Sequence, residues 1–280
     1  MMTEDKRTWG PKPRYEGAYF YKRPPEHRDT IISVAGPCSI ETPEQVGLVL
    51  RALKEAGGVT YVRGGPWSYG TYPPLEPGLR DGDLTMFANA VHDAGMRCVV
   101  ECLDIRLLDL VAARVDAIQI GARQAQNYPL LIEVGKVSKA KGSPVFLKRG
   151  VGMTVDEWLG AAEYIIAQGA NIILVERGSA TYHNHVRWGV DITAIAYIAE
   201  KLDIPVLVDG SHGTGRRDLV APVTLAGIAA GASGFVLECH PWPEKSKSDA
   251  EQAFPLAAVK PLFDSVKAVW GARRATKFTV

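Results

Sequence analysis

The sequence predicts an α/β protein built as a single (β/α)8 (TIM) barrel over residues 30–280, behind a short N-terminal arm of residues 1–29. From Thr30 onward, short β-branched runs alternate with amphipathic stretches rich in Ala and Leu, which is typical of repeated βα units. Eight such runs occur, the number that closes a parallel barrel of ordinary size. A doubly wound sheet is the alternative, but no Gly-x-Gly-x-x-Gly follows the first run.

The predicted elements follow one another along the chain in regular order. The arm is polar and rich in Pro, Arg and Tyr, so we expect it to lie on the surface. Helices are expected between the strands, for example over 43–57 and 154–169, and Thr154 with Glu157 has the spacing of a capping box. Glycine follows several of the helices, where a left-handed C-cap is favoured. The predicted strands cover 31–36, 59–63, 97–101, 116–120, 144–148, 171–176, 205–209 and 234–238.

Composition excludes several classes of protein. The 280 residues carry a formal charge of +1 and are 46% hydrophobic, which argues against a disordered chain, a nucleic-acid partner or a polybasic membrane patch. No apolar run approaches the length of a bilayer span, and the first residues contain no signal-type apolar stretch, so we expect no membrane partner and a cytoplasmic location. Four cysteines are too few for a disulfide scaffold and indicate reduced thiols or a metal ligand among them.

Reactive or charged side chains stand at the end of every predicted strand. In a barrel, the carboxyl ends of all the strands meet on one face, which is where barrel enzymes carry out their chemistry. A single charge after a strand is usually a solvated loop residue, but eight of them at intervals of 22 to 38 residues predict an active site. The eight are Cys38, Arg63, Glu101, Arg123, Lys148, Glu176, Asp209 and Glu238.

Four cations belong to the predicted active face. Arg63 and Lys148 are the last residues of the predicted strands 59–63 and 144–148, and Arg123 and Arg177 come shortly after the strands 116–120 and 171–176. Such a cluster is costly unless a multiply charged anion lies within it, and Arg suits both phosphate and carboxylate. The cluster therefore predicts a small substrate that carries both groups. The alternative is that some of these cations form structural ion pairs with Glu101, Glu176 or other acids.

A second set of side chains offers ligands of a different kind. A thiol, an imidazole and two carboxylates at Cys38, His212, Glu238 and Asp249 suit a divalent transition metal such as Mn²⁺, Fe²⁺, Co²⁺ or Zn²⁺. Their spacing alone is weak support, because they are scattered over 211 residues. A lone cysteine is commonly an apolar filler, and lone acids commonly lie on the surface.

These residues lie in stretches that resemble the 3-deoxy-7-phosphoheptulonate (DAHP) synthases, in particular the short type Iβ branch related to 3-deoxy-octulosonate 8-phosphate (KDO8P) synthase. The resemblance covers about residues 30–265, with several motifs in matching order. The motifs are AGPCSIE (35–41), VRGG (62–65), IGAR with QN (120–127), FLKRG (146–150), AAEYI (161–165), VERG (175–178), DGSHGTGRRD (209–218), AAGASGFVLECHP (229–241) and KSDAEQ (247–252).

The resemblance implies an enzyme that condenses phosphoenolpyruvate (PEP) with an aldose phosphate, erythrose 4-phosphate in DAHP synthases, and releases inorganic phosphate. It implies that Cys38, His212, Glu238 and Asp249 hold one divalent metal ion per subunit. It also implies that Arg63, Arg123, Lys148 and Arg177 bind PEP, with Lys148, Glu101 and His212 as the catalytic set. Glu101 would order the attacking water. A Schiff base on Lys148, with its pKa lowered by Arg149 and Arg123, is the rival mechanism.

The chain departs from the family where the aldehyde binds. Typical members continue RGG into AFKPRTSP, whose Lys and Arg positions are here Ser68 and Gly70, with Thr71 retained. The usual IRTFE after ERG is replaced by SATYHN, which introduces Tyr182 and His183. Either other cations, such as Arg216, Arg217 or Lys22, bind the acceptor phosphate, or the acceptor is a different, unphosphorylated aldehyde in a specialised pathway. In the second case Ser68, Thr71, Tyr182 and His183 would line its pocket, together with Trp67, Tyr69 and Tyr72.

The resemblance carries further expectations about assembly and regulation. Family members are usually homodimers or homotetramers and serve aromatic amino acid biosynthesis through the shikimate pathway. Residues 1–29 leave no room for the regulatory domain that some members carry, so we expect insensitivity to aromatic amino acids. A barrel that has lost catalysis and serves as a partner subunit is a further alternative, and the four retained ligand residues argue against it.

Overall fold

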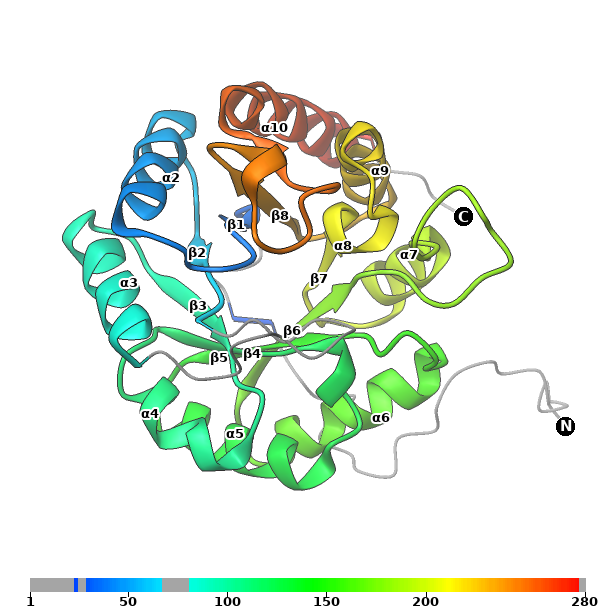
Figure 1. Cartoon of the computed structure of the whole chain (residues 1–280). Coiled ribbons are helices and arrows are strands. Elements are labelled where there is room, and N and C mark those ends of the chain that lie inside the picture. The colour runs from blue at the N-terminus through cyan, green and yellow to red at the C-terminus, as the bar shows by residue number, and fades with distance from the viewer. Residues whose placement is uncertain (1–22, 25–28, 67–80, 277–280) are drawn as a thin grey trace, which may run out of the picture.

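The computed structural model describes residues 23–24, 29–66 and 81–276, and within them it is a closed barrel of eight parallel strands surrounded by helices (Figure 1). Neighbouring strands pair in sequence order, and β1 pairs with β8 to close the ring. The predicted (β/α)8 barrel is therefore confirmed. The strands are β1 (Ile32–Gly36), β2 (Tyr61–Arg63), β3 (Cys98–Glu101), β4 (Ala117–Ile120), β5 (Pro144–Lys148), β6 (Asn171–Glu176), β7 (Val206–Asp209) and β8 (Gly234–His240).

The outer ring of helices lies where the amphipathic stretches predicted it. The predicted 154–169 helix begins one residue later, because Thr154 is its N-cap and shares a capping box with Glu157, and it ends at Ile166. The helices are α2 (Pro43–Ala56), α3 (Asp81–Asp93), α4 (Leu108–Ala112), α5 (Tyr128–Lys141), α6 (Val155–Ile166), α7 (Ile192–Lys201), α8 (Gly210–Thr214), α9 (Arg217–Ala230) and α10 (Val259–Ala275).

Two features at the end of the barrel were not expected from the sequence. Strand β8 runs two residues beyond its predicted end, and His240 pairs there with the short parallel strand β9 (Phe254–Pro255). The segment between β8 and β9 contains Asp249, so this extra pairing returns the chain to the mouth of the barrel. Most of the predicted N-terminal arm lies outside the described residues.

The apolar core has two layers. Inside the barrel, alternate strand residues form a compact cluster in which the rings of Tyr61 and Phe146 meet edge to face at 5.2 Å. A larger cluster fills the space between the strands and the helices. The barrel interior is therefore packed, as the period-two alternation of the strands requires.

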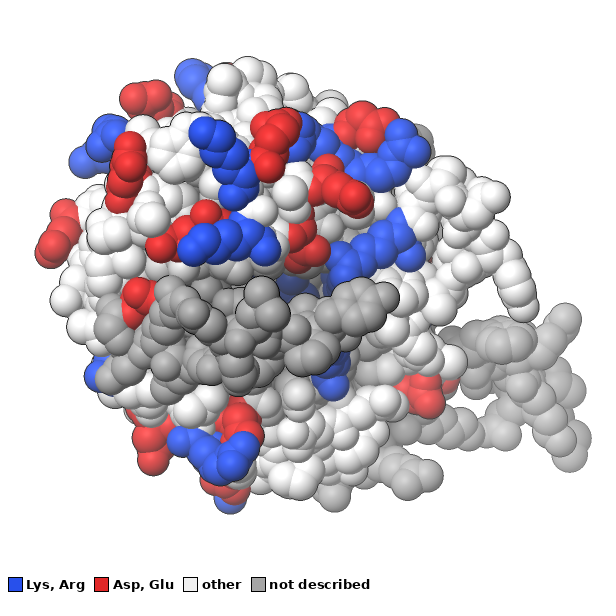
Figure 2. Space-filling view, in the orientation of Figure 1, with Lys and Arg blue, Asp and Glu red and all other residues white. Residues whose placement is uncertain are grey.

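The molecular surface mixes both signs of charge. Figure 2 shows Lys and Arg interspersed with Asp and Glu over the face in view, in agreement with the formal charge of +1. Among the described residues, no helix has both the length and the apolar character that crossing a membrane demands.

Candidate active site

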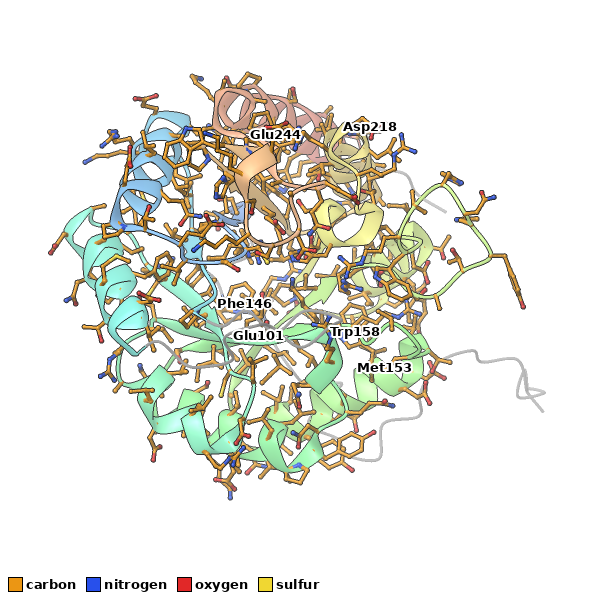
Figure 3. The ribbon with its side chains drawn as sticks, viewed as in Figure 1. Glu101, Phe146, Met153, Trp158, Asp218 and Glu244 are labelled. Atoms are coloured by element: carbon orange, nitrogen blue, oxygen red, sulfur yellow. The ribbon has the colours of Figure 1, made fainter. Side chains whose placement is uncertain are left out.

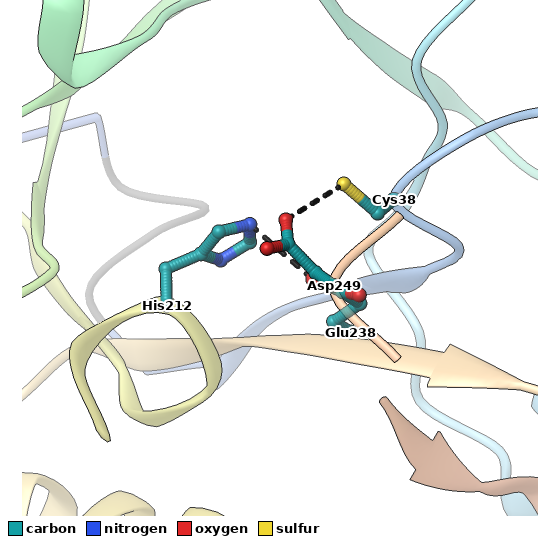
Figure 4. Close-up of side chains that lie close together, drawn as sticks. All are labelled: Cys38, His212, Glu238 and Asp249. Carbon is teal, nitrogen blue, oxygen red and sulfur yellow. Dashed lines mark hydrogen bonds and ion pairs between the residues drawn. The ribbon is translucent and has the colours of Figure 1, made fainter. Parts of the chain in front are cut away.

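Four side chains of metal-ligating type meet at the carboxyl ends of β1, β7 and β8. They are Cys38, His212, Glu238 and Asp249, and one ligand atom of each lies within 4.8 Å of all the others (Figure 4). The Cys38 thiol lies 3.3 Å from Asp249 Oδ2, and His212 Nε2 lies 3.3 Å from Glu238 Oε2. The closed barrel thus brings together residues that are up to 211 positions apart in the sequence.

The imidazole of His212 is held by the residue that ends β7. Asp209 caps the short helix α8 and accepts a hydrogen bond from the His212 backbone N–H at 3.0 Å. Its carboxylate also lies 2.9 Å from His212 Nδ1, which leaves Nε2 to face Glu238. Burial lowers the pKa of His212 to about 4, with Lys148 and Arg63 acting in the same direction against Asp209. The ring is therefore neutral at pH 7 and offers a lone pair at Nε2.

Glu238 is buried on β8 with only part of its hydrogen-bonding capacity used. Gln252 Nε2 donates to Oε2 at 2.8 Å, and the backbone N–H of Glu238 donates to Ser211 Oγ at 3.1 Å. The other carboxylate oxygen, Oε1, is buried without a hydrogen-bond partner among the described residues. Burial raises the pKa of Glu238 to about 8, and Asp249 adds to the effect while Arg63 opposes it. The nearby charge of Arg63 therefore does not offset the cost of burying this carboxylate.

Asp249 reaches the cluster from a strained backbone position. Its φ of 52° makes it the one non-glycine residue in the left-handed region among the described residues. Asp is one of the few side chains that tolerates this region at modest cost. Arg187 Nη1 lies 3.1 Å from Asp249 Oδ1, while Asp249 Oδ2 faces Cys38. This backbone conformation places the Asp249 carboxylate between Arg187 and Cys38.

The four donors suit a divalent transition metal by their chemistry. Burial raises the pKa of the Cys38 thiol, with Glu238 and Asp249 adding to the effect. Ionising both carboxylates and the thiol together is unfavourable without a cation, because each added negative charge opposes the next. A bound dication would reverse that balance and would also pair with the orphaned Glu238 Oε1. The residues present therefore fit a metal site.

The cations gather beside this cluster. Lys148, at the end of β5, forms an ion pair with Asp209 at 2.9 Å, and Arg63, at the end of β2, lies 3.5 Å from Glu238 Oε2. Both are buried. Asp209 therefore contacts both Lys148 and His212, and Glu238 lies between His212 and Arg63. The two halves of the site share their carboxylates.

Glu101 lies among the cations, toward the middle of the barrel (Figure 3). A side chain at Gly121 would place its Cβ 1.8 Å from Glu101 Oε1, so the carboxylate occupies space that only glycine leaves. Burial raises the pKa of Glu101, although the charges of Lys148, Arg63, Arg123 and Arg177 all lower it. All four predicted PEP-binding cations are therefore close enough to act on this one group.

Arg177 and Arg123 lack the acidic partners that Arg63 and Lys148 have among the described residues. Burial lowers the pKa of Arg177, Asp209 opposes this, and the like charges of Arg187 and Arg123 lower it further. The Arg177 guanidinium lies 5.8 Å from the centre of the Trp188 ring. Neither Arg177 nor Arg123 forms an ion pair within the described ranges. The positive charge at this end of the cluster is therefore not neutralised by ion pairs among the described residues.

The sequence matches the DAHP synthetase I family over residues 27–268. The chain belongs to the DAHP synthetase I family. It is 42% identical over 235 residues to the phospho-2-dehydro-3-deoxyheptonate aldolase of Thermotoga maritima, covering 84% of this chain and 68% of the relative. It is also 26% identical over 251 residues to the 2-dehydro-3-deoxyphosphooctonate aldolase of Desulfotalea psychrophila, covering 83% and 87%.

Solved structures of the DAHP synthetase I family superpose closely on this chain. The crystal structure of the Thermotoga maritima DAHP synthase matches with a TM-score of 0.82 and 40% identity, covering 88% of this chain and 71% of that one. A truncated form of the Thermotoga maritima enzyme matches with a TM-score of 0.78 and 39% identity, covering 88% of both chains. The resemblance to DAHP synthases is thereby confirmed, and the chain is a carbon–carbon bond-forming enzyme that uses PEP.

Within this family fold, one strand-end acid has a structural partner. Glu176 forms a buried ion pair with Arg149 at 2.9 Å and accepts the Gly178 N–H at 2.7 Å. Arg149 also lies 3.1 Å from Asp191. Glu176 is thus paired with a cation outside the predicted PEP-binding set, whose members Lys148 and Arg63 have other acidic partners. The Arg149 guanidinium is therefore held by two acids of this part of the barrel.

The acceptor half of the family site is only partly within the described residues. Ser68 and Thr71 lie outside them, as do Gly70, Lys22 and the aromatic residues of 67–72. Tyr182 and His183 are exposed, Tyr182 fully, so neither is packed over the cation cluster. The guanidinium of Arg216 pairs with Asp218 at 2.8 Å, and that of Arg217 pairs with Glu244 at 2.6 Å and with backbone carbonyls. Asp218 lies in the first turn of α9 and Glu244 in the 3-10 turn after β8 (Pro243–Lys245), both toward the rim of the molecule (Figure 3).

Three residues that support the site were not identified as such from the sequence. Gln252 bonds Glu238, Arg187 pairs with Asp249, and Gly121 leaves room for Glu101. Gln252 and Gly121 stand inside motifs that the sequence does show, KSDAEQ and IGAR. Their presence in those motifs is the signal that was available, but their partners are set by contacts between distant segments.

Proposed function

We propose that this chain is a metal-dependent DAHP synthase, which condenses PEP with erythrose 4-phosphate to give DAHP and inorganic phosphate. The observation that carries the proposal is the joining of a four-donor cluster at Cys38, His212, Glu238 and Asp249 to a group of buried cations through shared carboxylates. The 42% identity to a Thermotoga maritima protein of that activity supports it. The product would enter aromatic amino acid biosynthesis through the shikimate pathway.

One divalent metal ion would be held by Cys38, His212, Glu238 and Asp249. When bound, such an ion supplies Lewis acidity toward a carbonyl oxygen. Asp209 would fix the His212 tautomer, and Gln252 would orient the Glu238 carboxylate. Mn²⁺, Fe²⁺, Co²⁺ and Zn²⁺ all accept this donor set, so the physiological ion depends on availability rather than on the residues.

PEP would bind among Arg63, Arg123, Lys148 and Arg177. At pH 7 it carries close to three negative charges, since the second pKa of a phosphate ester is about 6. Its phosphate and carboxylate would neutralise the positive charge at the Arg177 and Arg123 end of the cluster. The like-charge repulsion that lowers the pKa of Arg177 would then become attraction to the substrate.

The residues beside the bound PEP would direct the reaction. The C3 carbon of PEP would attack the aldehyde carbon, and the aldehyde oxygen would take up a proton to become a hydroxyl. Water would add at C2 and lose a proton, and the bond between C2 and the phosphate oxygen would then break, leaving a carbonyl at C2 and free inorganic phosphate. Glu101, whose pKa burial raises, would orient that water and accept its proton. The 2.9 Å ion pair between Lys148 and Asp209 favours an ammonium that binds PEP over a neutral amine that forms a Schiff base.

A second candidate function keeps PEP and changes the aldehyde. Ser68 and Gly70 replace the basic residues of the usual acceptor motif. The observation that favours this candidate is that Arg216 and Arg217, the described cations considered as replacements, are already paired with Asp218 and Glu244. The acceptor would then be an unphosphorylated aldehyde in a specialised pathway, bound near Ser68, Thr71, Tyr182 and His183.

Phosphate release from PEP in the presence of Mn²⁺ tests both candidates. Full turnover with erythrose 4-phosphate supports a DAHP synthase, whereas turnover only with another aldehyde from a panel supports the changed acceptor. Cys38→Ala should abolish turnover. Cys98→Val should retain it, because Cys98 lies at the amino end of β3, away from the active-site face of the barrel. Activity of Cys38→Ala equal to that of the wild type would contradict the metal assignment. Absence of turnover with every aldehyde, together with no bound metal, would favour a non-catalytic subunit.

We also propose that the chain assembles, as members of its family usually do, into a homodimer or homotetramer, to be measured by light scattering of the purified chain.

A further inference from the structure

A second group of metal-ligating side chains lies at the opposite end of the barrel from the active site. His92 is in the last turn of α3, Cys98 is the first residue of β3, and Asp116 directly precedes β4. The amino ends of parallel strands lie at the face away from the catalytic loops. None of the three residues contributes to the active site described above.

The three ligand atoms are already close together. His92 Nε2 lies 2.9 Å from Asp116 Oδ2 and 3.9 Å from Cys98 Sγ. Asp116 Oδ2 also accepts the backbone N–H of Cys98 at 2.7 Å, which fixes the carboxylate at the strand end. All three ligand atoms lie within 4.8 Å of one another. In a tetrahedral zinc site with ordinary bond lengths, ligand atoms stand about 3.3–3.8 Å apart, so small side-chain shifts suffice.

Charge and access both suit a cation at this position. A thiolate, a carboxylate and a neutral imidazole carry two negative charges, which balance a dication. Cys98 is fully buried, while the side chains of His92 and Asp116 are 43% and 32% exposed, so one side of the cluster opens to solvent. The neighbouring cations are engaged elsewhere: the Arg97 guanidinium lies over the Tyr61 ring at 4.6 Å, and the Lys141 amine bonds the Val115 carbonyl at 2.8 Å.

We propose that His92, Cys98 and Asp116 bind one thiophilic divalent cation of the Zn²⁺ class, with water in the fourth position. The soft sulfur ligand favours Zn²⁺ and Co²⁺ over Mg²⁺ or Ca²⁺, which prefer oxygen. A bound ion would join the end of α3 to the starts of β3 and β4, and would stabilise that part of the barrel by mass action. The proposal does not depend on the proposed function, because it uses no residue of the active site.

Metal binding here must displace a proton from sulfur. Burial raises the pKa of Cys98 to about 12, and Asp116 both supports and opposes the shift through its charge and its hydrogen bond. The thiol therefore enters the site protonated, and forming the metal–sulfur bond releases one proton to solvent. Binding should therefore strengthen as the pH rises.

Cobalt titration of the full chain tests the proposal, because each of the two sites holds one cysteine. Co²⁺ bound to a thiolate gives a near-ultraviolet charge-transfer band. The wild type should bind two Co²⁺ per chain, and Cys38→Ala should retain one Co²⁺ together with a thiolate band that arises from Cys98. Cys38→Ala/Cys98→Val should lose the band, and Cys38→Ala/His92→Gln should bind Co²⁺ at least tenfold more weakly. Cys38→Ala/Cys102→Ala is the matched control and should keep the band, because Cys102 is buried like Cys98 but belongs to neither group of ligand residues.

Each result bears on one site alone. A band in Cys38→Ala that disappears with Cys98→Val, and that Zn²⁺ displaces, supports the second site whatever the catalytic assay shows. Absence of the band in a Cys38→Ala protein whose circular dichroism matches that of the wild type overturns it. A band that persists in Cys38→Ala/Cys98→Val also overturns it, because another thiol would then be the ligand.

Discussion

Asp209 joins the two halves of the candidate site through a single carboxylate. It lies 2.9 Å from Lys148 Nζ and 2.9 Å from His212 Nδ1, and the pKa of this buried acid is held well below its ordinary value by His212 and Lys148 in spite of burial. Because Asp209 contacts both Lys148, a proposed PEP-binding cation, and His212, a proposed metal ligand, it should influence both. Its loss should therefore be felt in folding and in metal affinity together.

Asp209→Asn leaves the buried Lys148 without its counter-ion, and we expect it to lower the free energy of unfolding by about 3–5 kcal/mol. It should also weaken metal binding by about 10–100-fold, because the amide no longer fixes the His212 tautomer. Urea unfolding and metal titration measure the two effects. Asp218→Asn, at an exposed pair with Arg216, should change neither measurably. An Asp209→Asn protein as stable as the wild type would contradict this role.

The raised pKa of Glu238 predicts how metal binding depends on pH. In the metal-free protein the pKa of this carboxyl is about 8, against an ordinary value of 4.5. Its contribution to folding stability is therefore fully present below pH 4.5 and is lost as the pH rises through 8. Metal binding must remove that proton, and from this group alone the apparent affinity should rise by about tenfold per pH unit below 8. The increase in Tm caused by a fixed concentration of Mn²⁺ should thus be larger at pH 8 than at pH 6. Equal increases in Tm at pH 6 and pH 8 would contradict the raised pKa of Glu238 in the metal-free protein.

Gly121 tests the position of Glu101. In Gly121→Ala the new methyl group would overlap Glu101 Oε1 and displace the carboxylate. We expect kcat for phosphate release to fall by about 100-fold, a typical cost of misplacing a catalytic group by about 1 Å. Gly152→Ala is the matched control, since its Cβ would meet nothing within 4 Å. Similar rates for the two variants would remove Glu101 from the catalytic set.

Among the single elements, the N-terminal caps of α8 and α6 have different roles, one in positioning an active-site residue and the other in stabilising an outer helix. Helix α8 has five residues and serves to place His212, with Asp209 as its cap. Helix α6 is an ordinary outer helix, and its capping box between Thr154 and Glu157 satisfies backbone N–H groups at its first turn. A cap in the outer ring should therefore affect stability without affecting the chemistry.

Thr154→Ala removes the side-chain oxygen that accepts the Glu157 N–H, and we expect it to lower the free energy of unfolding by about 1 kcal/mol. Turnover per folded molecule should stay at the wild-type value. Thr154→Ser keeps the hydroxyl and should lose no more than a few tenths of a kcal/mol. Urea unfolding alongside the phosphate assay separates the two effects, and a loss in kcat for Thr154→Ala would show that α6 does more than cover the barrel.

At the scale of the whole molecule, stability depends on closing the ring between its two ends. Strand β1 pairs with β8 along five residue positions, and α10 packs against both α2 and α9 (Figure 1). Phe263 of α10 is buried and meets Phe235 of β8 edge to face, with ring centres 5.0 Å apart. The last helix therefore closes the outer layer over the seam.

Phe263→Ala should cost about 3–5 kcal/mol, because a cavity is left at the seam between the first and last strands. Ser265→Ala, two residues along the same helix and exposed, should be close to neutral. Denaturant unfolding of the two variants makes the comparison. If Phe263→Ala unfolds with the wild-type midpoint, the seam does not depend on α10.

Much of the barrel was predictable because strands and helices each impose a characteristic period on the apolar residues of a short stretch of sequence. The eight predicted strands begin within two residues of the observed ones, and Thr154 with Glu157 marked the start of α6. The convergence of Cys38, His212 and Glu238 followed from the rule that parallel strands end on one face. Asp249 follows no barrel strand directly, and only its motif pointed to it.

The sequence by itself determined the fold class, the family and the order of reactive residues around the barrel mouth, because these depend on local periodicity and on motifs. The tertiary structure decided which charges pair: Lys148 with Asp209, and Glu176 with Arg149 rather than with the predicted PEP-binding cations. It also brought His92, Cys98 and Asp116 together. Such contacts depend on where side chains from distant segments point after the ring closes, and no spacing along the chain records that direction.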